Sequence, residues 1–468
     1  MKNLTLTHLV AIVCMGVAGQ ANAQTGTVNL TVTAADFRIN PYATARDDVA
    51  VVSPAGARQT NRFRNPASGA PSTNPFRRAW VSMTITRNGT SSMYCRRTDD
   101  FGQVQIPWIS ALPATATISV RPEAINATVS SCDQASADFT ILTGTPVTNE
   151  ISIILFQSKF ALTAGNRTLT TTVGGTLGSI FQEAVSAYLT SLETLEMQDA
   201  NGLPFTGTTS TRNSVKGFQV FINDPNGLNV APTFDRIITS VNRTTLKPVT
   251  MAHEIGHLVA WNNLDLFFPI IDPLYDYQCY GALGGWSHTT QECSKVVFHE
   301  GFADAHAGLW MWQRNADPSP ILAISFPPAT GNVNVGSLNG GDLALEANGD
   351  AGDDIGCGDF TSGVRYRHTP CVTAALWDVV DNSPNDGDGV TTADLSDLVG
   401  AFRSYRDDWL CIWPNDNRCK HEGNYDPDPD GNNWKDFASA AAASPNITAA
   451  QLTAIQESSL ELGGTPND

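Results

Sequence analysis

The chain has 468 residues, a formal net charge of −18 and an isoelectric point near 4.7. That length exceeds what one ordinary hydrophobic core holds, so two or three domains are expected. The acidic balance argues against nucleic acid as a partner, because its phosphates would be repelled. Only 16% of the residues are charged, while Gly, Thr, Ser and Asn are abundant, and this composition favours extracellular, β-rich structure.

Residues 1–23 have the composition of a secretory signal peptide. Lys2 gives a positive start, an apolar stretch follows at 4–19, and "ANA" before Gln24 is a small-x-small cleavage site. The alternative, a membrane anchor, is disfavoured because the apolar run is short and His8 interrupts it. No later segment is apolar enough to span a bilayer, so we expect a secreted or periplasmic protein with no membrane span after signal cleavage.

Eight cysteines remain once the signal is removed, and an even number suggests disulfides in an exported chain. Eight cysteines permit on the order of 100 connectivities, but the spacings favour pairing between sequence neighbours. Zinc binding by cysteine is the rival interpretation, and the absence of any CxxC motif argues against it. The expected pairs are Cys95–Cys132, Cys279–Cys293, Cys357–Cys371 and Cys411–Cys419.

Residues 24–165 are predicted to form an accessory β-sandwich. Short runs of β character, such as those at 27–37, 78–89 and 116–122, alternate with Pro, Gly, Asn and Ser at the intervals expected of a sandwich. The segment "CRRTDDFGQVQIPW" at 95–108 resembles the strand–turn–strand of transthyretin-like or immunoglobulin-like modules. We therefore expect an accessory domain with no chemistry of its own.

The hydrophobic period changes near residue 176, and residues 166–440 are predicted to form a mainly helical domain with a small sheet. The expected fold class is α+β. Pro248 is a favourable residue for the first turn of one of these helices. The expected helices lie at 177–195, from about residue 248, at about 294–312, within 369–380 and at 392–405, and 441–468 is interpreted as one short helix and a tail.

The helix expected from Pro248 carries the motif "HEIGH". Residues i and i+4 of a helix lie on one face, so His253 and His257 can both reach one metal ion at about 2.0–2.1 Å from each nitrogen. Glu254 is rotated away from the metal axis, where it can accept a proton from metal-bound water. The alternative is a surface helix with scattered polar residues. Most of its other positions are apolar, however, so these three side chains are expected in an interior that demands partners for them.

A catalytic zinc needs three protein ligands and one open position. A third histidine six residues past His257 is one scheme, but that position is Asn263, and Ala260 replaces the glycine that usually accompanies it. The better candidate is "FHEGFADAHAG", where Glu300 and Asp304 are again i and i+4 on a helix. Glu300 would bind zinc, and Asp304 could accept the free ring N–H of a ligand histidine and fix its tautomer.

Together these two segments resemble the gluzincin metallopeptidases, of which thermolysin is a member. The signature of that family is HExxH followed by ExxxD on a second helix, and here it reads "HEIGH" and "EGFAD". The resemblance implies a zincin-like catalytic core whose zinc ligands are His253, His257 and Glu300. Glu254 would be the general base, and Asp304 would be the partner of a ligand histidine, with His253 favoured.

The sequence departs from that family at three points. The gap between the two motifs is longer than in thermolysin, and His299 stands where thermolysin-like members usually have Asn. His299 could compete as the ligand, but its i+4 position is Ala303, which offers no partner, so Glu300 is favoured. The Gly-x-Met-x-Asn motif of the gluzincin aminopeptidases is missing, which favours an endopeptidase.

The oxyanion of a tetrahedral intermediate needs a hydrogen-bond donor. Thermolysin-like enzymes use a histidine ahead of a later helix, and "YRHTPCVTAALWD" places His368 in such a position. Tyr366 and Arg367 are alternatives, and a loop histidine with no role is another interpretation. The remaining histidines have no comparable context and are interpreted as structural or surface residues: His288, His306 and His421.

Two acidic loops resemble oxygen-rich cation sites. "DPDPDGNNWKD" at 426–436 has aspartates at alternating positions before a glycine, as in the first half of an EF-hand loop, but Phe437 stands where that loop closes with Glu. "DNSPNDGDGVTTAD" at 381–394 is similar, with imperfect spacing. A solvated acidic turn is the alternative for both, and any calcium would be structural. The candidate calcium ligands are Asp426, Asp428 and Asp430 in the first loop and Asp386 and Asp388 in the second.

The leading hypothesis is a secreted zinc metallopeptidase that hydrolyses protein or peptide substrates through a zinc-activated water, with Glu254 as its base. The rival hypothesis is an exported binding or adhesion protein in which the zinc helices only hold the fold together. Glu254 counts against that rival, because a structural site has no use for a base at this position. A zinc hydrolase acting on a non-peptide amide is a third hypothesis.

Overall fold

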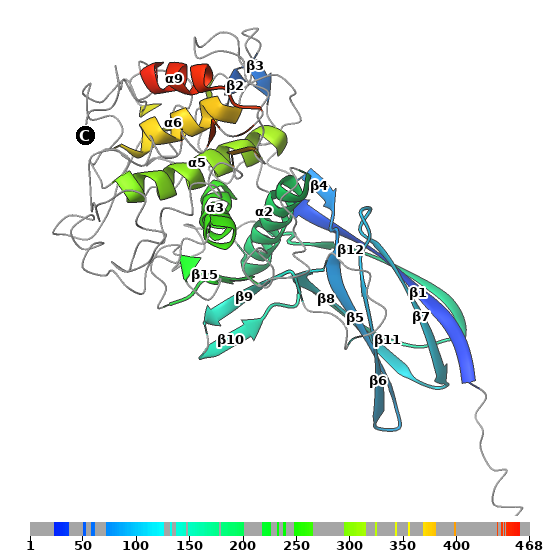
Figure 1. Cartoon of the computed structure of the whole chain (residues 1–468). Helices are drawn as coiled ribbons and strands as arrows, with labels where there is room; N and C mark the ends of the chain where they lie inside the picture. The colour runs from blue at the N-terminus through cyan, green and yellow to red at the C-terminus, as the bar shows by residue number, and fades with distance from the viewer. Residues whose placement is uncertain are drawn as a thin grey trace, which may run out of the picture.

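The structure, a computed structural model, has a mixed α+β architecture in which strands dominate the N-terminal part, as the sequence predicts (Figure 1). The residues that it describes are 23–36, 50–52, 58–60, 72–125, 132, 137–146, 148–176, 179–200, 218–225, 232–233, 237–239, 248–264, 294–314, 323–324, 342–343, 354–355, 368–380, 397–398, 438, 441–442, 444 and 446–458.

Strand β1 (Ala23–Asp36) is the central strand of a four-stranded sheet. Strand β12 (Gly165–Val173) pairs with it in parallel along one edge. Strands β7 (Gln103–Ala111) and β4 (Ser72–Pro75) pair with it antiparallel along the other edge. Every second residue of β1 from 28 to 34 is buried, because successive side chains of a strand point to opposite faces. One face of this sheet therefore packs on the core.

The second sheet has nine strands and continues from the strand-rich part of the chain into the helical part. Its order is β14-β15-β13-β9-β8-β5-β6, with β10 paired to β9 and β11 to β8. The bounds are β5 (Ala79–Arg87), β6 (Thr90–Arg97), β8 (Thr115–Ala124), β9 (Phe139–Thr145), β10 (Asn149–Ser152), β11 (Phe156–Ala161), β13 (Phe218–Ile222), β14 (Pro232–Thr233) and β15 (Ile237–Thr239).

Hydrogen bonding between strands crosses residue 165, where a domain boundary is predicted. Strand β13 pairs in parallel with β9, and β12 pairs with β1. Parallel neighbours need a long crossover connection, and helix α2 (Ile180–Ala200) lies within the connection from β9 to β13. The division into domains stays a prediction, but the sheets do not end at that residue. Two small sheets complete the strands: β2 (Ala50–Val52), β3 (Arg58–Thr60) and β16 (Ala323–Ile324) in one, and β17 (Asp342–Leu343) and β18 (Asp354–Ile355) in the other.

The β5–β6 hairpin shows how the local sequence determines its turn. Arg87 pairs with Thr90, so the loop has the two residues Asn88 and Gly89. Both have positive φ, 48° and 79°. A two-residue hairpin turn with positive φ at both positions favours Asn-Gly, and the sequence supplies that dipeptide.

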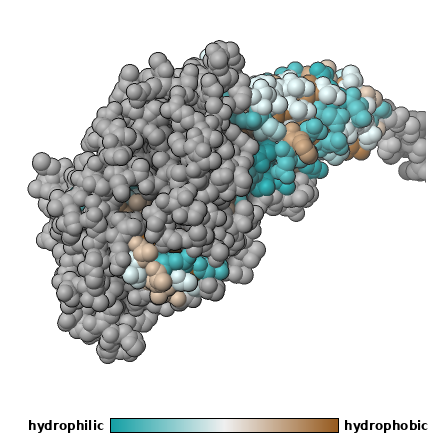
Figure 2. Space-filling view, turned by 90° about the horizontal axis from the view of Figure 1, so that it is seen from above, coloured by the Kyte–Doolittle hydropathy of each residue, from teal (hydrophilic) through white to brown (hydrophobic). Residues whose placement is uncertain are grey.

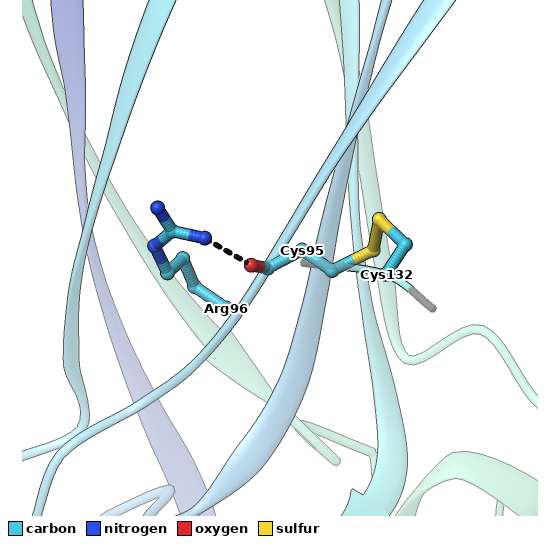
Figure 3. Close-up of a disulfide and its surroundings, with 3 residues drawn as sticks. All are labelled: Cys95, Arg96 and Cys132. Atoms are coloured by element: carbon cyan, nitrogen blue, oxygen red, sulfur yellow. Dashed lines mark hydrogen bonds between the residues drawn. A yellow bond between two sulfur atoms is a disulfide. The ribbon is translucent and has the colours of Figure 1, made fainter. Parts of the chain in front are cut away.

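The predicted disulfide Cys95–Cys132 is confirmed, with a Cα–Cα distance of 4.9 Å (Figure 3). It joins β6 to the segment after β8, and the backbone oxygen of Cys95 accepts a hydrogen bond from the guanidinium of Arg96 at 2.8 Å. Cys371 is buried and disulfide-bonded, with a partner outside the described residues. The other five predicted disulfide cysteines also lie outside them.

The helices form successive layers on one side of the sheets. Helix α2 contacts both large sheets and also α3 and α5; α5 then contacts α6, and α6 contacts α9 (Figure 1). The bounds are α3 (Pro248–Leu264), α5 (Ser294–Arg314), α6 (Thr369–Val380) and α9 (Ala449–Ser458). The sequence predictions of helices from residue 248, from residue 294 and within 369–380 are confirmed.

Helix α2 is fixed to the sheets through Tyr188. Its ring packs against Phe76 and Phe139, with centroid distances of 4.4 and 5.2 Å. Its hydroxyl donates a hydrogen bond to the backbone oxygen of Arg77 at 2.7 Å. The guanidinium of Arg77 in turn donates two hydrogen bonds of 2.8 Å to Glu196 on the same helix. Because these contacts fix the helix at two places, its opposite side is held in position for the helices that pack on it.

The visible surface of the strands is mainly hydrophilic in the view from above, with scattered apolar side chains (Figure 2). None of the helices in the described part of the chain combines the length and the hydropathy needed to cross a lipid bilayer. The large hydrophobic side chains that are exposed are Met93, Phe101, Ile109, Ile151, Ile154 and Phe181.

Candidate metal centre

Helices α3 and α5 approach each other closely at Gly256. A Cβ atom at this position would lie 2.9 Å from the Cα atom of Ala303, closer than such atoms come in proteins. Gly301 allows a similar approach between α5 and α6, because its Cβ would lie 3.0 Å from Cγ1 of Val372. Glycine inside a helix costs about 1 kcal/mol relative to alanine. Here it lets the backbones that carry the two motifs pack together.

The close packing brings three predicted metal ligands to one point. The Nε2 atoms of His253 and His257 are 2.9 Å apart, and Oε2 of Glu300 lies 3.2 Å from each of them. All three side chains are buried. They form a group that could hold a metal ion, with one ligand atom from each residue.

The fourth predicted residue, Asp304, lies on the far side of His253. Its Oδ1 atom is 2.7 Å from Nδ1 of His253, and the aspartate is fully buried. With the proton on Nδ1, the ring donates to Asp304 and turns the lone pair of Nε2 toward Glu300 and His257. This arrangement fixes the tautomer that a metal ligand needs.

Glu254 is buried beside this group. Its Oε2 atom has no hydrogen-bond partner among the described residues. Burial raises the pKa of Glu254 well above its ordinary value; His253 opposes this effect, while Glu300 and Asp304 add to it. A carboxyl group with a raised pKa and a free oxygen is suited to take up and release a proton.

The site as a whole attracts positive charge. Burial alone would lower the pKa of His253, but the carboxylates of Asp304, Glu300 and Glu254 raise it well above its ordinary value. Burial alone would raise the pKa of Glu300, but the imidazoles of His257 and His253 lower it far below its ordinary value. Burial lowers the pKa of His257. Three carboxyl groups around two imidazoles would be balanced by a cation between them.

The ligand triangle fits a tetrahedral zinc ion. Zinc at about 2.0–2.1 Å from each ligand atom places those atoms about 3.3 Å apart. The observed separations are 2.9, 3.2 and 3.2 Å, so one ion could contact all three atoms after a slight opening of the triangle. Two imidazoles and one carboxylate are also a known donor set for catalytic zinc, which leaves one corner open.

His306 contributes to the site in a way that sequence reasoning missed. It is fully buried, and its Nδ1 atom lies 3.0 Å from the backbone oxygen of Ala252, the residue before His253. Its Nε2 atom lies 3.4 Å from Nε2 of Gln198 on α2. Of the two expected roles, a structural residue or a surface residue, its burial supports the structural role. The sequence feature that could have indicated this role is its position two residues after Asp304, in the mostly apolar segment "FADAHAG".

His368 immediately precedes α6 and is buried. Its backbone oxygen accepts hydrogen bonds from the amides of Cys371 and Val372 at 3.1 and 3.3 Å, so it caps the helix. Val372 contacts the position of Gly301, which places the start of α6 beside the helix that carries Glu300. The group of possible metal ligands in the described residues does not include His368, and its role as oxyanion donor stays a prediction.

Several sequence predictions lie outside the described residues. His299 belongs to α5, but its side chain is among those not described, so its competition with Glu300 as a ligand stays open. The other residues in this group are Tyr366, Arg367, His288, His421, residues 1–22 of the predicted signal peptide 1–23, and the candidate calcium ligands Asp386, Asp388, Asp426, Asp428 and Asp430.

Compared with known proteins, the sequence matches no protein-family model and no curated protein. What the chain can do chemically must therefore be inferred from the geometry of His253, Glu254, His257, Glu300 and Asp304.

Proposed function

We propose that this protein is an exported zinc metallopeptidase of the gluzincin type. The observation that carries the proposal is the triangle of His253 Nε2, His257 Nε2 and Glu300 Oε2, with separations of 2.9 to 3.2 Å. Asp304 contacts His253 on the side away from the triangle, and Glu254 lies beside the triangle with one oxygen that has no partner among the described residues. The substrates would be proteins or peptides.

The residues of the chain divide the proposed chemistry among them. Zinc in this site would polarise the carbonyl of the scissile bond and make water nucleophilic near neutral pH. Glu254 would accept the proton of the attacking water and return it to the leaving nitrogen. A donor from the start of α6, where His368 lies, would stabilise the negative charge that develops on the carbonyl oxygen.

We extend the proposal to the rest of the chain. The helices α3 and α5 would be the centre of a zincin-like catalytic core, and the strands of residues 24–165 would form an immunoglobulin-like or transthyretin-like accessory module. Any calcium in the acidic loops would stiffen them. The signal segment would direct the protein to the periplasm or the medium.

The test compares the wild-type protein with Glu254→Gln. The amide has nearly the same shape as the carboxylate but cannot act as a base, so we expect peptide hydrolysis to fall by roughly 100-fold or more. Zinc content should stay near one ion per chain, because Glu254 is not a ligand. Casein and a peptide library serve as substrates, and a zinc chelator followed by zinc addition is the reversible control.

The rival hypothesis, an exported binding protein with a structural metal, makes the opposite prediction. If the wild-type protein binds zinc but cleaves no peptide, and Glu254→Gln changes nothing that is measured, the peptidase proposal is wrong. Cleavage that survives both chelation and Glu254→Gln would contradict it as well.

A further inference from the structure

His306 lies beneath the turn of α3 that bears the ligand histidines. Its Nδ1 atom is 3.0 Å from the oxygen of Ala252, and a Cβ atom at Gly256 would lie 3.1 Å from the same Nδ1. The ring thus touches α3 immediately before His253 and in the gap between His253 and His257. Both distances place the Nδ1 atom of His306 against the same stretch of α3.

The hydrogen bonds of this ring determine its protonation. The oxygen of Ala252 can only accept, so Nδ1 of His306 carries the proton and donates it. Nε2 is then the acceptor, and the side-chain amide of Gln198 donates to it over 3.4 Å. His306 is therefore a neutral ring that connects the backbone of α3 to the side chain of Gln198 on α2. It is not a reserve metal ligand, because both of its ring nitrogens are engaged.

The connection extends to the sheets through α2. Gln198 is buried on the same helix as Tyr188 and Glu196, which hold that helix against the sheet-bearing segment around Arg77. Gln198 and His306 are 108 residues apart in sequence, and His306 and Ala252 are 54 apart. One imidazole thus connects α2 to α3 and α5, the two helices that carry the ligands.

We propose that His306 is a positioning residue that sets how α3 sits against α5, so that His253 and His257 face Glu300 and Asp304. This inference rests on the proposed function only in assuming that the ligand triangle binds a metal. A polar ring has a reason to occupy this place, since an apolar side chain of similar size could fill the space but could not hold the Ala252 oxygen. Leucine at position 306 would leave α3 free to slide or rotate against α5.

Two substitutions of His306 separate the effect of the donor at Nδ1 from the effect of the side chain's bulk. Asparagine can place its amide nitrogen near the position of Nδ1, so His306→Asn keeps a donor for the Ala252 oxygen. His306→Leu keeps the bulk and loses the donor. If the donor to α3 is what matters, the smaller asparagine should preserve the metal site better than the larger leucine, although its loss of packing should destabilise the fold.

The experiment measures the zinc dissociation constant of the full-length protein by competition with a chromophoric chelator. We expect His306→Leu to raise it by about 10- to 100-fold, the range found when groups that orient metal ligands are removed. His306→Asn should stay within about threefold of the wild-type protein. The visible absorption bands of the cobalt-substituted protein should shift in His306→Leu, because they report ligand geometry and not global stability.

Thr194→Val is the matched control. Thr194 is fully buried on α2, and its hydroxyl donates to the oxygen of Thr190 within the same helix. Its loss removes a hydrogen bond that lies within α2 and leaves the contacts of His306 with Gln198 and Ala252 in place, so zinc affinity and the cobalt spectrum should be unchanged. Should His306→Leu fail to fold, Gln198→Met removes the bond to Nε2 with a milder change, and we expect a rise of a few fold in the dissociation constant.

Two results would overturn the inference. One is wild-type zinc affinity and an unchanged cobalt spectrum in His306→Leu, or in Gln198→Met where that variant replaces it. The other is equal weakening in His306→Asn and His306→Leu, which would make the ring a packing element only. If the wild-type protein itself binds neither zinc nor cobalt, the proposed function fails first and this inference with it.

Discussion

Strand β8 and helix α3 are both buried, but they bury different kinds of residue. In β8 the burial mostly follows the pleat, with Ser119 as an exception, and Ala116, Ile118 and Val120 are fully buried and apolar. In α3 all nine residues from 251 to 259 are buried, so no face of this segment is exposed to water. Three of the nine are His253, Glu254 and His257.

The difference shows where each region gets its stability. Each large apolar side chain in the sheets contributes roughly 1.5–3 kcal/mol by leaving water, whatever its neighbours are. A buried ionisable group costs several kcal/mol unless a partner compensates it. The sheets and the helices share one hydrophobic core, but the helix layer also buries ionisable groups, whose cost partners such as Asp304 and Glu300 must offset.

The largest effect should come from removing a ligand carboxylate. Glu300→Ala leaves two imidazoles and no anionic ligand, so we expect zinc affinity to fall by about a thousandfold, roughly 4 kcal/mol. Chelator competition measures the affinity. Amide hydrogen exchange in β1 and β8 should be unchanged in the metal-loaded protein, because the sheet core does not contain the site. Zinc affinity within tenfold of the wild-type value would show that Glu300 is not a ligand.

The matching change in the sheets should have the opposite profile. Ile118→Ala removes a fully buried side chain and should cost about 3 kcal/mol of unfolding free energy. Zinc affinity of the folded protein should not change. Ile109→Ala is the control, since Ile109 is 59% exposed and its truncation should cost less than about 1 kcal/mol. Urea unfolding measures both, and a loss of zinc affinity in Ile118→Ala would break the separation of the two regions.

The sequence predicted best those features that one element determines alone. The i, i+4 spacing places His253 with His257, and Glu300 with Asp304, because each pair shares one helix face. The expectation that the two pairs meet in space rests on the resemblance to the gluzincin motifs. The contact between Asp304 and His253 agrees with that expectation. The Asn88–Gly89 turn and the Cys95–Cys132 bridge also follow from local features, the dipeptide itself and the spacing of neighbouring cysteines.

The features that the sequence did not predict depend on distant elements packing together. Strand β13 joins β9 across helix α2, and no periodicity in either strand encodes that pairing. The ring of His306 finds its partners on two other helices. Gly256 and Gly301 lie within the two motifs, and the sequence alone does not indicate what packs against them. Their importance lies in the backbone that faces them, which is visible once α3, α5 and α6 are placed.

Gly256 gives the sharpest test of that close approach, with the smallest expected effect. A methyl group at Gly256 would lie 2.9 Å from the Cα atom of Ala303, and that backbone atom cannot turn away as a flexible side chain can. Helix propensity alone would make Gly256→Ala stabilising by about 1 kcal/mol. We expect the clash to outweigh this gain and to leave a net loss of about 1–2 kcal/mol, together with weaker zinc binding as α3 moves away from α5.

Gly175→Ala is the control for Gly256→Ala. Apart from its chain neighbours, no atom of the described residues lies within 4 Å of the Cβ position at Gly175, so this change should be neutral or slightly stabilising through the unfolded chain. Urea unfolding and chelator competition on both variants separate strain from propensity. If Gly256→Ala is as stable as the wild-type protein and binds zinc equally well, the helices are not held at this separation. The ligand triangle would then owe its geometry to the side chains alone.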